Sequence, residues 1–274
     1  MAIHQLVDPR AEVHPEATIG PFCVVDGPVR IEAGVELKNH ATVYGKTIIG
    51  AGSILFPHCV VGSDPQDLKF RGEDSETRIG KRCRVHEYVT VSKGTAGGGM
   101  ITEVGDDCLL MAGAHVAHDC RLGNHIVIGN HSQLAGHIVI GDRAIVSGMV
   151  GVHHFATIGQ LAFVGAMSGV RNDVPPFCIV EGYPAEARTI NLVGLRRAGF
   201  DDEQIRTVKD MFRILIHDKD RPRREALAEA AEIEVAPTSP AAILRDWVAQ
   251  QLDVSVKGRL QEAGRVKAPV SAAS

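Results

Sequence analysis

Seven of the chain's 13 histidines lie between positions 115 and 154, five of which form a candidate cluster, and histidine is the side chain best suited to proton transfer near neutral pH. Because the ordinary pKa of an imidazole is about 6.5, its neutral ring can take a proton from an attacking hydroxyl group or bind a metal ion. A single histidine on a surface needs no functional explanation, whereas a cluster favours a site. The cluster consists of His115, His118, His137, His153 and His154.

A repeat of six residues places these histidines. A branched aliphatic residue recurs at every sixth position, which is neither the period of a helix nor the alternation of a hairpin. The pattern predicts short strands that end in tight turns, with three strands closing a triangular coil of about 18 residues and stacked coils forming a parallel β-solenoid. The repeat runs at this spacing from Val7 to Val61, returns at Ile79, Val85 and Val91, and continues in a second register from Val104 to Val170.

The 18-residue coil brings the histidines together. His118, Gly136 and His154 are separated by 18 positions each, so we expect them to form a column near one corner of the solenoid. The other three histidines of the cluster, His115, His137 and His153, each lie within three positions of a member of that column. A functional site is therefore predicted at this corner.

Two interruptions of the repeat predict loops at about 63–78 and 92–103. In the first, Asp67 and Glu73 occupy positions where the repeat requires aliphatic residues, and the segment is rich in polar and turn-forming residues. The second contains four glycines in SKGTAGGGMIT. Loops that leave a regular scaffold frequently carry functional residues.

The chain beyond the repeat predicts a small helical domain. The repeat ends near Val170, and Pro175-Pro176 begins an expected linker to about residue 186, so we predict a β-helix domain over 1–186 and a helical domain over 187–274. Apolar residues share one face of a predicted helix that begins near position 201, Ser239-Pro240 is typical of a helix start, and a weaker helix is expected over 222–235. The tail from about Lys257 is expected to be loose.

The composition excludes several classes of protein. The formal net charge of −4 gives no support for a nucleic-acid partner. The sequence contains no stretch of 18 apolar residues and starts without the apolar segment of a signal peptide, so a membrane span is not expected and the cytoplasm is the default location. The cysteines fill small positions of the repeat without a Cys-x-x-Cys pair, which indicates buried thiols and not a zinc or redox centre.

Specific motifs resemble one hexapeptide-repeat family, the UDP-N-acetylglucosamine O-acyltransferases that begin lipid A synthesis. The matching segments cover nearly the whole chain in order: GSDPQDLKF, GTAGGGMITEVG, MAGAHVAHDCRLGN, LAGHIVIGD, VHHF, VGAMSGVRNDVPPF and NLVGLRRAGF. The resemblance implies a left-handed β-helix, although the period alone does not give the hand. It also implies a homotrimer with active sites between subunits, and transfer of a 3-hydroxyacyl group from acyl carrier protein to the sugar 3-position of UDP-N-acetylglucosamine. The phosphopantetheine arm of the carrier protein delivers the acyl group, so no separate cofactor and no metal are implied.

Three residues acquire catalytic roles by the match. The resemblance makes His118 the general base, because a sugar hydroxyl needs one as it attacks a thioester that is already activated. Asp119 is a secondary candidate for orienting His118, since neighbours on a strand normally point to opposite sides. The N–H of Gly136 is the implied donor to the thioester oxygen, and glycine lets a ligand approach the backbone closely.

The remaining site residues are assigned to binding by the same match. Each role follows from a motif position: Gln66 and Asp67 for the sugar, Lys69 for the pyrophosphate or pantetheine, His115, His137 and His153 for the cleft lining, Asn191 and Arg197 for the nucleotide, and Ala166 for the end of the acyl groove. Because Ala166 is small, we expect a medium-to-long acyl chain.

Three departures from the family pattern put nucleotide recognition in doubt without changing the reaction class. His154 stands where the family often has glutamine, and Val193 and Ala198 replace an acidic and a basic residue. The acyl chain length stays open, as does the choice between a hydroxyl and an amine at the sugar 3-position.

Three alternatives compete with this interpretation. The N-acyltransferase of the same pathway carries a sizeable domain before its solenoid, whereas here the repeat begins at Val7. A γ-type carbonic anhydrase is also a hexapeptide trimer and uses histidines to bind zinc, but it lacks the PQDLK and AHVAHDC segments. A non-catalytic scaffold would not need polar loops beside a histidine-rich corner.

Overall fold

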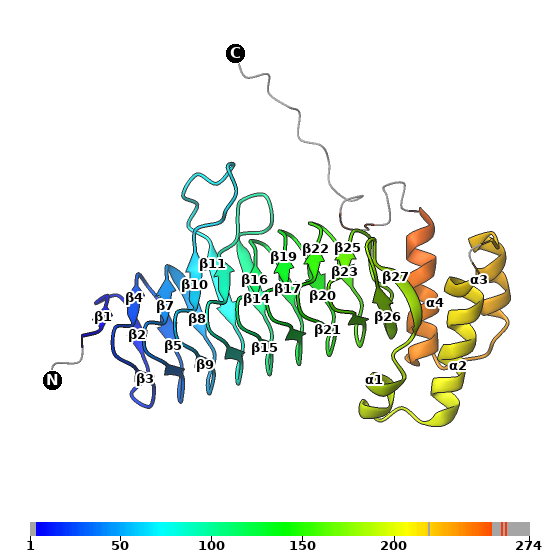
Figure 1. Ribbon diagram of the computed structural model, residues 1–274, viewed down its shortest axis with the longest axis horizontal. Coiled ribbons are helices and arrows are strands. Elements are labelled where there is room, and N and C mark those ends of the chain that lie inside the picture. The colour runs from blue at the N-terminus through cyan, green and yellow to red at the C-terminus, as the bar shows by residue number, and fades with distance from the viewer. Residues whose placement is uncertain (1–3, 219, 254–258, 260, 262–274) are drawn as a thin grey trace, which may run out of the picture.

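The computed structural model describes residues 4–218, 220–253, 259 and 261, and within it residues 6–190 form a left-handed parallel β-helix of three sheets (Figure 1). The aliphatic residues of the repeat point into the solenoid, and from Val25 to Val170 they are 0–4% exposed. Those of the first coil, such as Val7 and Val13, are only half-buried, because no described coil lies beneath them. The six-residue period therefore specifies a continuous core.

The three sheets run along the solenoid, and successive strands of a sheet come from successive coils. The first sheet contains β1 (Leu6–Val7), β4 (Val24–Asp26), β7 (Thr42–Tyr44), β10 (Val60–Ser63), β13 (Thr90–Ser92), β16 (His115–Val116), β19 (Gln133–Leu134), β22 (Gly151–Val152) and β25 (Gly169–Val170). The second contains β2 (Glu12–Val13), β5 (Arg30–Ile31), β8 (Lys46–Ile49), β11 (Glu76–Ile79), β14 (Ile101–Val104), β17 (Arg121–Leu122), β20 (Val139–Ile140) and β23 (Thr157–Ile158). The third contains β3 (Thr18–Ile19), β6 (Glu36–Leu37), β9 (Ile54–Leu55), β12 (Arg84–Val85), β15 (Leu109–Leu110), β18 (Val127–Ile128), β21 (Ile145–Val146), β24 (Phe163–Val164), β26 (Cys178–Glu181) and β27 (Glu186–Ile190).

The parallel register confirms the predicted 18-residue coil around the histidine-rich corner. His115 pairs with Gln133, Gln133 with Gly151, and Gly151 with Gly169. Many of the turns between strands contain one residue in the left-handed region, with φ of 61° at Asp119, 63° at His137 and 65° at Phe155. Equivalent turn residues of neighbouring coils lie above one another, and the rings of His137 and Phe155 stack with centroids 4.4 Å apart.

Two loops leave the same side of the solenoid (Figure 1). They span residues 64–75 and 93–100, a little less than predicted, because β10, β11 and β14 each extend to four residues. The loops contact each other at their bases: the Ser75 hydroxyl donates to the Gly94 carbonyl at 2.5 Å, and Lys93 Nζ lies 2.8 Å from Asp64 Oδ1. We call them the first loop and the second loop.

The predicted linker before residue 186 is wrong, because this segment contains one more strand, β26, and leads directly into another, β27. β26 pairs in parallel with β24, and β27 then pairs antiparallel with β26. Phe177, Cys178 and Val180 of this segment are 0–2% exposed. Pro175 and Pro176 interrupt the six-residue phase just before β26, and this interruption concealed the strands in the sequence.

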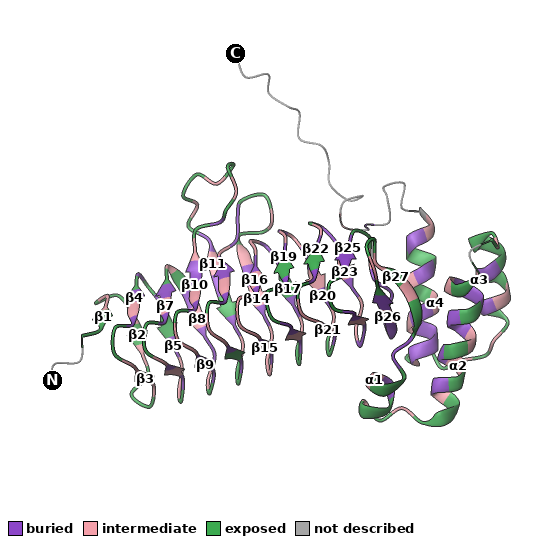
Figure 2. Ribbon diagram, viewed as in Figure 1, coloured by how far each residue is buried: buried purple, intermediate pink, exposed green. Residues whose placement is uncertain are grey.

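The helices of the described chain pack around a second core (Figure 2). They are α1 (Leu192–Arg197), α2 (Asp202–Phe212) with a π-helical turn at Arg213–His217, α3 (Arg223–Ala231), α4 (Pro240–Gln250) and a short 3₁₀ turn at Gln251–Asp253. Ser239 caps α4 and Pro240 opens it, as predicted, whereas α1 was not predicted. In the described residues, every helix is too short or too polar to span a bilayer.

Candidate active site

His118 lies in the turn that follows β16, and its side chain is 14% exposed. Its Nδ1 is 2.8 Å from Asp119 Oδ2, and its Nε2 is 3.9 Å from Asp67 Oδ2 in the first loop. An ionised carboxylate only accepts hydrogen bonds, so Nδ1 donates to Asp119, and in the neutral form of the ring Nε2 carries the lone pair. His118 therefore presents a proton-accepting nitrogen on the side of the first loop.

Asp119 is buried beneath His118, and hydrogen bonds to Thr95 and Thr102 fix its position. Its Oδ1 accepts from the Thr95 N–H at 2.8 Å, its Oδ2 accepts from the Thr95 hydroxyl at 2.5 Å, and its own N–H donates to the Thr102 hydroxyl. Burial favours the neutral acid, but hydrogen bonds from His118 and then from Thr95 outweigh it, so the pKa of Asp119 lies below its usual value. Asp119 therefore remains ionised beside the imidazole.

The expectation that Asp119 and His118 point to opposite sides is wrong. That rule applies to neighbours on a strand, whereas Asp119 lies in a turn with φ of 61°. The left-handed conformation rotates its side chain towards His118, and the two residues form a hydrogen-bonded pair.

His137 completes the cluster one coil away. Its Nδ1 is 3.7 Å from Asp119 Oδ2, and its ring meets the His118 ring edge-on. Ligand atoms of His118, Asp119 and His137 lie within 4.8 Å of one another, a spacing that could accommodate a metal ion. However, Thr95 and His118 already donate hydrogen bonds to both Asp119 oxygens, so the trio fits a hydrogen-bonded pair better than a metal centre.

Gly136 is the position where the backbone comes closest to His118. A Cβ atom on Gly136 would lie 2.5 Å from His118 Cε1 and 2.7 Å from Nε2, so only glycine fits beside this ring. Among the described residues, none accepts a hydrogen bond from the Gly136 N–H. The nitrogen that can accept a proton and a backbone donor thus lie side by side.

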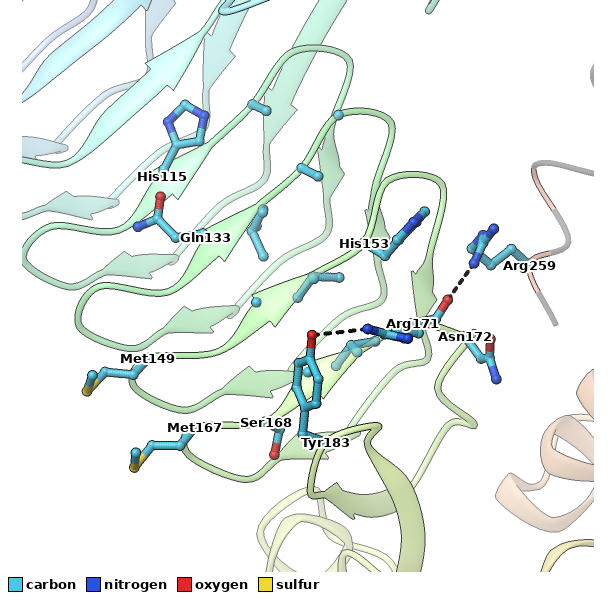
Figure 3. A pocket seen from close by; sticks show the side chains of 18 of the residues that line it. His115, Gln133, Met149, His153, Met167, Ser168, Arg171, Asn172, Tyr183 and Arg259 are labelled. Carbon is cyan, nitrogen blue, oxygen red and sulfur yellow. Dashed lines mark hydrogen bonds between the residues drawn. The ribbon is translucent and has the colours of Figure 1, made fainter. Parts of the chain in front are cut away.

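A cavity of about 990 Å³ is lined by these two residues and by residues of the later coils, several of which are shown in Figure 3. Apolar side chains and glycines form much of its wall, and Met149 and Met167 lie on successive turns. We call it the first groove. Its lining includes Gln66, His115, His118, Gln133, Leu134, Gly136, Met149, Gly151, Val152, His153, Met167, Gly169, Arg171, Tyr183 and Arg259.

A second cavity, about 520 Å³, lies on the other side of His118 and Gly136, beneath the two loops. We call it the second groove. Most of its lining is polar: Gln66, Asp67, Lys69, Glu73, Thr95, His118, His137 and His154, with Phe70 and Phe155 among the rest. The structure thus brings the predicted residues of the first loop to the histidine cluster, and His118 and Gly136 line both grooves.

The other predicted histidines line the walls of the grooves. Nδ1 of His115 lies 2.7 Å from the Thr90 hydroxyl, and burial first, then nearby His118, lowers the pKa of His115. His153 Nδ1 lies 3.0 Å from the His154 carbonyl oxygen, and the two rings are adjacent. His153 lines the first groove and His154 the second.

Besides the buried Asp119, three predicted residues, all assigned to binding, lie outside both grooves of the single chain. Ala166 is exposed in a turn, and its neighbour Met167 lines the first groove instead. Asn191 is 6% exposed, caps α1, and donates its Nδ2 to the Leu161 carbonyl at 2.8 Å. Its side chain is already used within the chain, whereas Arg197 is exposed at the end of α1.

Several residues of the grooves were missed by the sequence analysis. Met149 and Met167 are separated by 18 positions, so the same column argument that grouped the histidines would have found them. Arg171 and Tyr183 are joined by a hydrogen bond of 3.1 Å; Tyr183 comes from the segment interpreted as a linker, and Arg171 lies just before it. Thr95 had no signal beyond its place in the glycine-rich loop.

The chain is similar to two family models. The one described as "Udp N-acetylglucosamine O-acyltransferase; Domain 2" matches residues 173–251, and the one described as "Bacterial transferase hexapeptide (six repeats)" matches residues 101–136. These matches cover the helical part and the centre of the solenoid.

Curated relatives and solved structures agree with these matches. A Rhizobium johnstonii protein named acyl-[acyl-carrier-protein]–UDP-N-acetylglucosamine O-acyltransferase is 40% identical, over 90% of this chain and 92% of its own length. The Synechocystis protein of that name is 44% identical over 71% and 70%. The structure of LpxA from Acinetobacter baumannii is similar, with a TM-score of 0.84 and 34% identity over 90% of this chain and 95% of its own. An Arabidopsis UDP-N-acetylglucosamine acyltransferase has a TM-score of 0.77 and 29% identity over 92% and 99%.

Proposed function

Because this chain belongs to the family of the acyl-[acyl-carrier-protein]–UDP-N-acetylglucosamine O-acyltransferases, we propose that it transfers a 3-hydroxyacyl group from an acyl carrier protein thioester to the 3-hydroxyl of UDP-N-acetylglucosamine, the first step of lipid A synthesis. The observation that carries the proposal is the position of His118 and Gly136 where the first groove, with apolar side chains and glycines along much of its wall, meets the more polar second groove. The first groove suits the acyl chain, and the second suits the sugar.

The mechanism is direct attack assisted by a general base. Nε2 of His118 takes the proton of the sugar hydroxyl as its oxygen attacks the thioester carbonyl, and the ionised Asp119 stabilises the imidazolium that forms. The carbonyl oxygen gains negative charge and accepts a hydrogen bond from the Gly136 N–H. When the tetrahedral intermediate collapses, the carbon–sulfur bond breaks, and His118 returns the proton to the leaving thiolate of the carrier protein.

The first loop supplies binding groups at the same point. Asp67 Oδ2 lies 3.9 Å from His118 Nε2, so its carboxylate can accept a hydrogen bond from a second hydroxyl of the sugar whose attacking hydroxyl donates to that nitrogen. Gln66 lines both grooves and Lys69 lines the second, where a cation suits a pyrophosphate or a pantetheine phosphate.

The direct test is purified enzyme with UDP-N-acetylglucosamine and a panel of hydroxyacyl and unsubstituted acyl carrier protein thioesters. We expect a 3-O-(3-hydroxyacyl) product and one free carrier thiol for each sugar acylated. A parallel reaction with the 3-amino sugar nucleotide compares the two acceptors. Thiol release without an acylated sugar would mean hydrolysis and would contradict the proposal.

We also propose that the active form is a homotrimer. Arg197, which the family match assigns to the nucleotide, lies outside both grooves of its own chain, so a neighbouring subunit would have to bring it there. Light scattering should give the mass of three chains. A stable monomer with full activity would contradict the shared site.

Arg197→Ala should raise KM for the nucleotide sugar by about tenfold or more while leaving kcat nearly unchanged. The exposed guanidinium can bind a phosphate or ribose away from the reacting carbonyl, so its loss removes binding common to the ground and transition states. Arg196→Ala is the matched control, because Arg196 is also exposed on α1 and lies 3.7 Å from Asp202. If both variants have the KM of the wild type, Arg197 is a solvated surface residue and does not bind the nucleotide sugar.

The acyl chain should lie in the first groove, and Gly151→Leu should shift the preference to shorter chains. A Cβ atom on Gly151 would meet no atom within 4 Å, so the new side chain can project into the groove without disturbing the solenoid. Each methylene excluded from the groove loses about 0.8 kcal/mol of burial. Ala166→Met tests the position that the family match implied. Competition between thioesters of different chain lengths measures the chain-length preference of both variants. If Gly151→Leu keeps the wild-type order of preference, the acyl chain does not bind in this groove.

A further inference from the structure

The second loop is fitted around the Asp119 carboxylate. Thr95 is 6% exposed and donates both its N–H and its hydroxyl to the two oxygens of Asp119. Gly98 of the same loop lies directly against this carboxyl group, because a Cβ atom there would be 1.9 Å from Asp119 Cγ. The glycines of this loop therefore allow the backbone to approach a charged side chain from a different coil.

Thr95 itself is held rigidly. Its carbonyl accepts hydrogen bonds from the N–H groups of Gly98 and Met100, which close the loop into a compact turn. The preceding Gly94 bonds Ser75 and Glu76 at the base of the first loop. The hydroxyl that reaches Asp119 is thus fixed from both sides of the loop.

Two donors on Oδ2 determine which way the carboxylate faces. The Thr95 hydroxyl and His118 Nδ1 both donate to this oxygen, at 2.5 and 2.8 Å, while the Thr95 N–H fixes Oδ1. Without the hydroxyl, the carboxylate would keep one backbone bond and could rotate about it. His118 would then lose the fixed acceptor that holds Nδ1 protonated and Nε2 directed at the grooves.

We propose that Thr95 is a positioning residue, whose hydroxyl fixes the Asp119 carboxylate and through it the orientation and tautomer of His118. The proposal rests on the proposed acyl transfer for its effect on rate, but its structural part concerns only these three residues. The lowered pKa of Asp119 agrees with it, because hydrogen bonds from Thr95 follow those from His118 among the interactions that stabilise the ionised form.

The test replaces the hydroxyl and keeps the shape. Thr95→Val should lower kcat by about tenfold to a hundredfold, the range for losing a residue that orients a functional side chain, with little change in either KM. Thr95→Ser, which keeps the hydroxyl, should stay within about threefold of the wild type. Thr77→Val is the matched control, since the Thr77 hydroxyl is buried in β11 without a hydrogen-bond partner in the described chain; it should leave kcat unchanged.

Two further measurements separate positioning from general damage. In an Asp119→Ala background, adding Thr95→Val should lower kcat less than about twofold, because the hydroxyl acts through the carboxylate. The pKa of Asp119, measured by ¹³C NMR of labelled aspartate carboxyl groups, should rise in Thr95→Val and not in Thr95→Ser. If Thr95→Val does not fold, Thr95→Ala takes its place.

An equal loss in both backgrounds, or an Asp119 pKa that is unchanged in Thr95→Val, would overturn the proposal. The NMR measurement requires no substrate, so it decides the role of Thr95 even if the protein fails to acylate UDP-N-acetylglucosamine. A failure of the proposed function and a failure of this inference are therefore distinct results.

Discussion

Replacing His118 with alanine should lower kcat by a factor of about 10²–10⁴, the usual contribution of a general base. His118 is the member of the His118–Asp119 pair that lines both grooves. Asp119 cannot replace it as the base, because the Asp119 side chain is fully buried. KM for the nucleotide sugar should change much less, since Gln66, Asp67 and Lys69 remain.

The control for this variant is His125→Ala. His125 also lies between two strands of the solenoid, but its side chain is 51% exposed and its charged partner, Asp107, is 4.0 Å away. Both variants should keep a melting temperature near that of the wild type. If His118→Ala melts normally and retains most of its kcat, His118 is not the base.

Gly136→Ala should reduce kcat by at least about a hundredfold without removing any functional side chain. The added methyl group would lie within 2.7 Å of two His118 ring atoms, so the imidazole must turn away and lose its alignment with Asp119. The same displacement moves the base relative to the Gly136 N–H, which separates the two groups that the transition state needs together.

Gly148→Ala provides the comparison, because a Cβ atom there would come no closer than 3.4 Å to its nearest neighbour and the residue lines neither groove. Steady-state kinetics and the tautomer of His118 by ¹⁵N NMR should differ from the wild type only in Gly136→Ala. Wild-type kcat in Gly136→Ala would show that the ring and the backbone need not be in contact.

The solenoid could be predicted because its physical cause is local. Each aliphatic residue of the period points inwards, and a coil of 18 residues follows from three equal sides, so the proximity of His118, Gly136 and His154 followed from arithmetic alone. The helix starts at Ser239 and near Asp201 could also be predicted from the sequence, because a capping side chain bonds backbone N–H groups within four residues of itself.

The rest depended on conformations that the period does not encode. The contact between Asp119 and His118 requires a left-handed turn residue, which the alternation of strands does not describe. The Thr95 contact joins residues 24 positions apart through a loop outside the repeat. In each case a backbone group, and not a periodic side chain, determines the geometry.

The segment from 171 to 190 has a consequence for how the solenoid ends. A stack of parallel strands leaves unpaired peptide groups at its last coil, and such an edge is a template for adding strands from another molecule. Here the chain occupies those groups itself: Val174 bonds Thr157 and Gly159 in one sheet, Gly182 and Ala185 bond Gly169 in the next, and β26 with the reversed β27 covers the third. A strand that runs antiparallel cannot continue the coil, so this segment protects the enzyme against end-to-end fibre growth at that face.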